Sequence, residues 1–143
     1  MQSSGVALVE NPGTSAQSME PYRDLHTIKE EAFTKIREYM GIHGFTPSKI
    51  DDAIIAVGEL ITNVGKHAYD GDNHCQTIVE LGITDSYIKI VVTDFGKGEI
   101  IEPTTIDLMD ENGFGLYIAM QVAEIVFLSK VTGFHSVQAI IRK

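Results

Sequence analysis

Residues 47–69 constrain the fold more than any other part of the chain, because one predicted helix carries two different faces. Thr46 and Pro47 favour a helix start, as a Ser/Thr cap and an early Pro both do. At about 100° per residue, one arc holds the apolar side chains of Ala53, Val57, Leu60, Ile61, Val64 and Ala68. A different arc of similar width holds Glu59, Asn63, Lys66 and His67. We therefore expect a helix with one face against a core and the other presenting four polar groups.

The remaining segments predict an α+β fold. Helices are expected at about 22–40 and 113–124, and strands at 6–9, 77–84, 87–93, 126–131 and 136–141. This order favours a two-layer sandwich of a mixed β-sheet with helices on one face. Residues 1–20, rich in Ser, Gly, Pro and Asn, are predicted to be a flexible tail, and residues 21–143 a single folded domain.

Composition excludes several classes of protein. The chain has 143 residues, which suits one domain, and a net charge of −9 without a basic run. Direct binding to nucleic acid is not expected, because phosphate backbones require a basic face. No secretory leader and no membrane-length apolar run is apparent, and the single cysteine, Cys75, suits a reducing compartment. A cytoplasmic protein is predicted.

The polar arc combines groups that suit a metal-bound phosphate. A carboxylate such as Glu59 can orient or deprotonate a nucleophile. An amide oxygen such as that of Asn63 is a neutral, hard ligand suited to Mg²⁺. Lys66 can direct a compact positive charge at a phosphate. Taken alone, such an arc is more often a solvated helix face.

Two glycine motifs follow. Asp94-Phe95-Gly96-Lys97-Gly98 comes at a strand end, where a carboxylate can accept from an exocyclic amino group and the glycines allow close backbone passage. Gly113-Phe114-Gly115-Leu116 lies at the start of a predicted helix, whose N-terminal amides suit a phosphate. Each motif alone could be an ordinary turn or loop. The spacing matches neither a Rossmann fingerprint nor a P-loop, and the histidines and Cys75 show no zinc-ligand spacing.

The order of these motifs resembles the three signature boxes of the histidine-kinase-like (GHKL, or Bergerat-fold) ATPases, over about residues 22–143. The stretch AVGELITNVGKHAY is especially similar to the corresponding helix of the bacterial anti-sigma-factor serine/threonine kinases. The short segment 99–112 also resembles the lid of that subfamily. The resemblance implies an ATP-binding domain with Mg²⁺ as cofactor.

The resemblance also implies a role for each motif position. Glu59 corresponds to the catalytic carboxylate, Asn63 to the Mg²⁺ ligand and Asp94 to the residue that holds the adenine amino group. Gly96 and Gly98 would let the chain pass close to base and ribose. The second glycine motif, Gly113, Gly115 and Leu116, would provide the lid hinge and amides for the phosphates.

One departure concerns positive charge. Segment 99–112 contains five acids and no Lys or Arg, whereas related kinases often place an arginine near the γ-phosphate. We hypothesise that Lys66 replaces that cation, because it lies three residues after Asn63, where the similar sensor histidine kinases commonly carry a phosphate-contacting lysine. For His67, a phosphate contact and a structural role both remain open.

The predicted function is that of an ATP-dependent regulatory serine/threonine kinase. Its substrate would be an anti-sigma-factor antagonist with a STAS-like domain, and the subfamily alone implies that it also sequesters a sigma factor. The alternative is an ATP-gated protein-binding module with little or no phosphotransfer, or, most simply, an α+β domain with accidental motifs. The sequence does not decide whether the chain forms a homodimer, as relatives often do.

Overall fold

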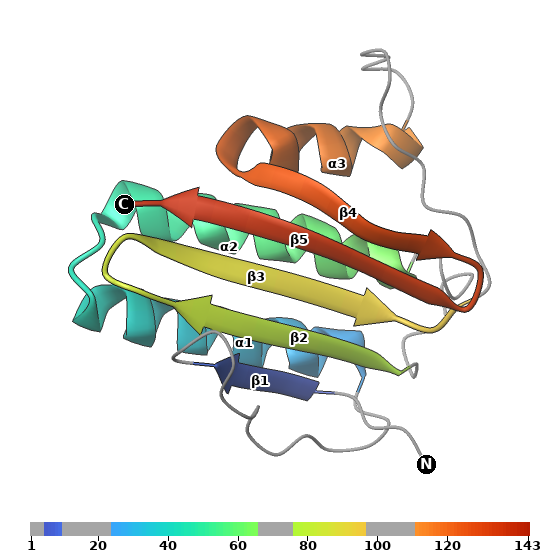
Figure 1. Cartoon of the computed structure of the whole chain (residues 1–143), viewed down its shortest axis with the longest axis horizontal. Helices are drawn as coiled ribbons and strands as arrows, with labels where there is room; N and C mark the ends of the chain where they lie inside the picture. Colours follow the sequence, from blue (N-terminus) through green and yellow to red (C-terminus); the bar gives the residue numbers. More distant parts are fainter. Residues whose placement is uncertain (1–4, 10–23, 66–75, 97–110) are drawn as a thin grey trace.

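The computed structural model describes residues 5–9, 24–65, 76–96 and 111–143 (Figure 1). In chain order the elements are β1 (Gly5–Val9), α1 (Leu25–Ile42), α2 (Pro47–Asn63), β2 (Thr77–Ile83), β3 (Tyr87–Asp94), α3 (Glu111–Val122), β4 (Glu124–Val131) and β5 (Phe134–Arg142). The predicted α+β class is confirmed. No helix in these described ranges is long and apolar enough to cross a membrane.

The five strands form one mixed sheet in the order β1-β2-β3-β5-β4. Strand β1 runs parallel to β2, whereas the β2–β3, β3–β5 and β4–β5 pairs are antiparallel. The two predicted hairpins, β2–β3 and β4–β5, are therefore present. Strand β1 confirms the short strand expected near residues 6–9, while the flexibility of the rest of segment 1–20 lies outside the described residues and stays a prediction.

Helices α1 and α2 cover one face of the sheet (Figure 1). Helix α1 begins at an Asp24 cap, whose carboxylate accepts from Thr27 N at 2.8 Å. Helix α2 begins at a Thr46 cap followed by Pro47, as the sequence predicts. Helix α3 packs mainly on α2 and contributes Leu116 to the core. The prediction that the helices share one face of a mixed sheet is thus confirmed.

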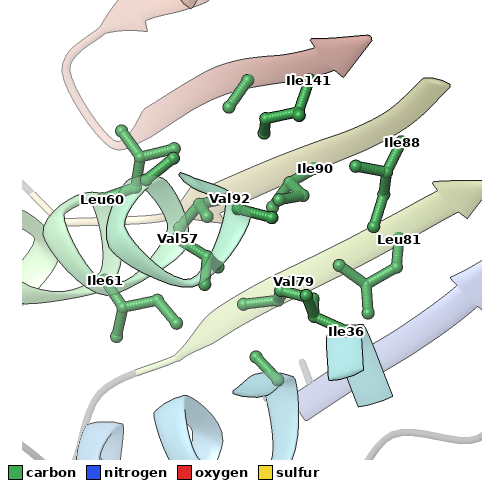
Figure 2. Close-up of a cluster of buried hydrophobic side chains, with 14 of the residues drawn as sticks. Ile36, Val57, Leu60, Ile61, Val79, Leu81, Ile88, Ile90, Val92 and Ile141 are labelled. Atoms are coloured by element: carbon green, nitrogen blue, oxygen red, sulfur yellow. The ribbon is translucent and has the colours of Figure 1, made fainter. Parts of the chain in front are cut away.

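The core lies between α1, α2 and the inward side chains of the three central strands (Figure 2). Five apolar residues of the predicted inner face of α2 are buried: Ala53, Val57, Leu60, Ile61 and Val64. From the sheet come Val79, Leu81, Ile83, Ile88, Ile90, Val92, Val137, Ala139 and Ile141. These strand residues alternate along each strand, which places them on the same side of the pleat. The two-faced interpretation of α2 is confirmed over its described length.

Element ends differ from prediction by up to two residues, apart from the first and second helices. Helix α1 starts at Leu25 rather than near residue 22, and α2 is regular to Asn63, with residues beyond 65 outside the described range. Helix α3 starts at Glu111, two residues before the expected start, so Gly113 and Gly115 lie further inside it than predicted. Glycine lowers helix propensity but does not forbid a helix that packing stabilises, which explains this difference.

Candidate functional site

Asp94, the last residue of β3, lies in a row of three buried polar residues that crosses the sheet. The register pairs Asp94 with Thr77 of β2 on one side and with His135 of β5 on the other. Asp94 has the same strand parity as Ile88, Ile90 and Val92, so its side chain faces the helices. A polar row thus continues the apolar core at the carboxyl end of β3.

The Asp94 carboxylate is held by two donors. Its Oδ1 accepts from the Gly96 amide at 3.0 Å and lies 2.7 Å from His135 Nδ1. Asp94 is 4% exposed and His135 is 1% exposed. Burial raises the pKa of Asp94, and the hydrogen bonds from His135 and Gly96 oppose that increase. A buried carboxyl whose pKa is perturbed in this way is typical of binding and catalytic sites.

The end of β3 is tied to the turn between β4 and β5. Gly96 O accepts from Gly133 N at 3.0 Å, and Gly133 turns the chain at a φ of 85° that suits glycine. The rings of Phe95 and Phe134 are 5.8 Å apart between centroids. The segment Asp94-Phe95-Gly96 is therefore held in place by the β4–β5 hairpin.

The polar face of α2 meets α3 at one glycine. Glu59 and Asn63 are partly buried, and a Cβ at Gly115 would overlap Glu59 Oε2 and lie 3.5 Å from Asn63 Oδ1. Glycine at position 115 is therefore needed for the Glu59 carboxylate to keep its present position. The structure therefore brings the E-x-x-x-N and G-x-G motifs into contact, as their assignment to one site requires.

Asn63 has an unsatisfied buried group. Within the described ranges its Nδ2 atom is buried and has no hydrogen-bond partner. A buried polar atom without a partner costs free energy, about 1–3 kcal/mol, unless a ligand or another group satisfies it. Asn63 is therefore a candidate ligand-contacting residue on structural grounds as well as by its motif.

The candidate groups gather at one end of the molecule. Figure 1 shows the carboxyl ends of α2 and β3 and the amino ends of α3 and β5 at the same end of its long axis, on the right of the view. Asp94, His135, Glu59 and Asn63 belong to those element ends or lie close to them. The three motifs, far apart in the sequence, thus share one end of the fold.

The remaining predicted site residues are placed less completely. Lys66, His67 and Gly98 lie outside the described residues, and Gly113 is placed only as part of α3. Leu116 is 4% exposed and belongs to the core cluster, so its side chain anchors α3. His135 was missed by the sequence analysis. Its parity with Val137, Ala139 and Ile141 is the signal that could have placed it on the inner face.

Comparison with known proteins agrees with this arrangement. Residues 23–136 match the family model described as histidine kinase-like ATPase domain. The chain belongs to this family. Membership of this family accounts for the α+β fold.

The curated relatives of this histidine kinase-like ATPase domain include serine-protein kinases. RsbW from Staphylococcus aureus (strain JH9) is 34% identical over 102 residues, 63% of this chain and 64% of the relative. RsbW from Bacillus subtilis (strain 168) is 30% identical over 86 residues, 52% of this chain and 54% of the relative. The chain therefore matches between about half and two thirds of the length of these relatives.

A solved structure supports the fold. The catalytic domain of the histidine kinase ThkA superposes with a TM-score of 0.50 at 11% identity, over 85% of this chain and 94% of that domain. This likeness shows that the chain has the fold of a histidine kinase catalytic domain.

Proposed function

We propose that this histidine kinase-like ATPase domain is an ATP-dependent serine/threonine protein kinase of the anti-sigma-factor type. The observation that carries the proposal is the contact of Glu59 and Asn63 with Gly115 at the same end of the fold as the buried Asp94. The similarity to RsbW serine-protein kinases supports the choice of reaction.

In this proposal Asp94 recognises the base. With Oδ1 engaged by His135 and Gly96, the second carboxylate oxygen is the acceptor left for the exocyclic amino group of adenine. A charged acceptor forms the stronger class of hydrogen bond, which favours adenine over a purine with a carbonyl at the same position. Gly96 and Gly98 allow the chain to pass close to the base and ribose.

Asn63 and Glu59 act at the phosphate end. The donor set fits Mg²⁺, which prefers oxygen ligands and is often held by one or two protein groups together with substrate phosphates. Bound Mg²⁺ would neutralise phosphate charge. No group of three or more His, Cys, Asp or Glu suited to a metal occurs in the described part of the chain. Asn63 Oδ1 is the proposed protein ligand, and Lys66, His67 and the Gly113 amide are proposed to contact the phosphates.

Glu59 is the proposed base. It takes the proton of the acceptor hydroxyl as that oxygen attacks the γ-phosphorus, and the bond from the γ-phosphorus to its bridging oxygen breaks to release ADP. The acceptor is proposed to be a Ser or Thr of a STAS-like anti-sigma-factor antagonist. Sequestration of a sigma factor, and dimerisation, are parts of the proposal that rest on the subfamily alone.

A second function is favoured by one sequence observation. Segment 99–112 has five acids and no Lys or Arg, and an arginine at a transferring phosphoryl group contributes about 10³–10⁵ in rate. An ATP-gated protein-binding module would need nucleotide binding but no such cation. It shares Asp94 and Asn63 with the kinase and differs in not needing Glu59.

Glu59→Gln separates the two functions. The protein is incubated with Mg²⁺ and γ-labelled ATP, alone and with STAS-domain candidates, and label on the partner is measured together with ADP affinity. We expect Glu59→Gln to keep ADP affinity and to lose label by about 100-fold or more, because general acid–base catalysis is typically worth 10²–10⁴.

Glu38→Gln, an exposed change of the same kind on α1, is the matched control and should leave label unchanged. ADP binding without label on any partner would favour the binding module. Absence of nucleotide binding would contradict both functions.

A further inference from the structure

His135 forms the shorter of the two hydrogen bonds to the Asp94 carboxylate, although no motif of the sequence includes it. Its Nδ1 lies 2.7 Å from Asp94 Oδ1, and only 1% of the residue is exposed. The pair joins residues 41 positions apart, on strands that are directly opposed in register. A histidine buried to this degree is held by its surroundings in one orientation, so it can fix the orientation of its partner.

The hydrogen-bonding capacity of the two side chains determines where the proton lies and which carboxylate oxygen stays open. An ionised carboxylate only accepts, so Nδ1 must carry the proton in that state. Oδ1 then accepts from both His135 Nδ1 and Gly96 N, while no described residue donates to Oδ2. Two donors on one oxygen fix the plane of the carboxylate and leave the other oxygen as the only acceptor with open capacity.

We propose that His135 is a positioning residue for base recognition, which holds Asp94 Oδ1 so that Oδ2 is presented to the exocyclic amino group of adenine. This inference rests on the proposed function, since it requires that the site binds an adenine nucleotide. Without the imidazole the carboxylate can rotate about its Cβ–Cγ bond and retains one donor, Gly96 N. Oδ2 would then accept less well from the amino group of adenine. It would also repel the carbonyl oxygen of another purine less strongly.

The opposing β5 strand gives this arrangement its rigidity. Backbone pairing at Asp94–His135 and the Gly96–Gly133 hydrogen bond fix both ends of the contact. On the other side of the sheet, Thr93 and Ser136 are joined by a buried 3.1 Å hydrogen bond between their hydroxyls. The imidazole therefore projects from a backbone that is held on either side of the Asp94–His135 pair.

The test compares two nucleotides that differ at the 6-position of the purine. ADP carries an amino group there and IDP a carbonyl oxygen. Affinities for both are measured by titration calorimetry in Mg²⁺ for the wild type, His135→Leu and His135→Asn. Asn places an amide donor close to the position of Nδ1, whereas Leu has none. His43→Leu is the matched control, because His43 forms a comparable 3.0 Å pair with Asp85 at the opposite end of β3.

We expect His135→Leu to reduce the ratio of ADP to IDP affinity by about tenfold or more, the usual range for a hydrogen bond to a charged group. His135→Asn should keep the ratio within about threefold of the wild type, and His43→Leu should leave it unchanged. An unchanged ratio in His135→Leu overturns the inference, even if both affinities fall together, because an equal loss indicates a merely structural role. A wild type that binds neither nucleotide overturns the proposed function and the inference with it.

A measurement on the wild type keeps the inference testable if His135→Leu does not fold. The ¹⁵N chemical shift of the His135 ring, recorded with and without ADP, reports which nitrogen carries the proton. We expect Nδ1 to remain protonated and hydrogen-bonded in the ADP complex. An unprotonated Nδ1 in that complex would overturn the inference.

Discussion

Gly115 is the residue at which α3 comes close to the polar face of α2. A methyl group there would overlap Glu59 Oε2, the far end of a flexible side chain. The carboxylate can move away from a methyl group at little cost, but only by leaving its present position.

We therefore expect Gly115→Ala to reduce phosphotransfer by about tenfold or more, since a displacement of about 1 Å can cost 10²-fold. The free energy of unfolding should stay unchanged or rise by up to about 1 kcal/mol, because Ala is the better helix former. Labelled-phosphate transfer and urea denaturation measure the two effects. Gly41→Ala on α1, where a Cβ meets nothing within 4 Å, is the control and should leave transfer unchanged. Full transfer in Gly115→Ala would contradict the placement of Glu59.

Asp94 predicts a pH dependence of stability. Burial raises the pKa of this carboxyl above 3.8, with opposing contributions from His135 and Gly96. A carboxyl with a higher pKa in the folded than in the unfolded chain binds more protons when folded. Its contribution to stability is therefore complete at low pH and is lost as the pH rises from 3.8 through the raised pKa.

Asp94→Asn removes this titration. We expect the stability of the variant relative to the wild type to increase as the pH rises through that window and then to level off. Urea denaturation of both proteins between about pH 4 and pH 8 measures the difference, which cancels the other carboxyl groups. A difference that changes in the opposite direction would show that hydrogen bonding, not burial, dominates at Asp94.

The sequence predicted some site residues and not others for a physical reason. Glu59 and Asn63 share one helix face, so helical periodicity alone places them together. The contact of both with Gly115 agrees with the motif order. The pairing of His135 with Asp94 could not be predicted, because the two residues are 41 positions apart and meet only through the order of strands in the sheet.

Helix α2 depends on its first turn as well as on its buried face. Thr46 Oγ1 accepts from Lys49 N at 3.3 Å, which satisfies one amide that the helix itself leaves unpaired. Thr46→Ala should lower the free energy of unfolding by about 1 kcal/mol. Urea denaturation measures the change.

Thr34→Ala is the control for this substitution. Thr34 lies within α1 and its hydroxyl donates to Glu30 O, so replacement by the stronger helix former should be neutral or slightly stabilising. Equal losses in the two variants would contradict a capping role for Thr46.

At the level of elements, the type of each was predictable but some ends were not. The residue patterns of segments 77–84 and 87–93 predicted the strands β2 and β3. Strand β4 begins at Glu124 rather than 126, and its pairing shifts between Phe127 and Ser129. A local irregularity of that kind depends on the partner strand and leaves no period in the sequence.

For the whole molecule, nucleotide binding should be linked to folding, because the candidate site is built from the ends of α2, α3, β3 and β5. A ligand that binds only the folded chain stabilises it by about 2.7 kcal/mol at a concentration of 100 times Kd. We expect Mg-ADP to raise the free energy of unfolding by that amount in the wild type. Asp94→Asn at the same ADP concentration should show little of the increase, and an equal increase would contradict base recognition by Asp94.

The overall architecture was predictable to the level of two layers and a mixed sheet, but the strand order was not. Local alternation identifies strands and hairpins, whereas the insertion of β5 between β3 and β4 is decided by packing of the whole chain. Because β5 lies next to β3, Asp94 and His135 are paired across the two strands. The least predictable feature of the fold is therefore the one that completes the buried polar row of Thr77, Asp94 and His135.

Helix α2 packs against the core with one face and carries candidate site residues on the other. The number of residues between the buried positions and Glu59 is therefore fixed by the helix geometry. One inserted residue would turn everything after it by about 100°, carrying Glu59 away from Gly115 and Ile61 out of the core. We therefore expect an insertion between Ala53 and Glu59 to disrupt the buried face and the Glu59–Gly115 contact together. Substitutions at exposed positions of α2 leave both faces in register.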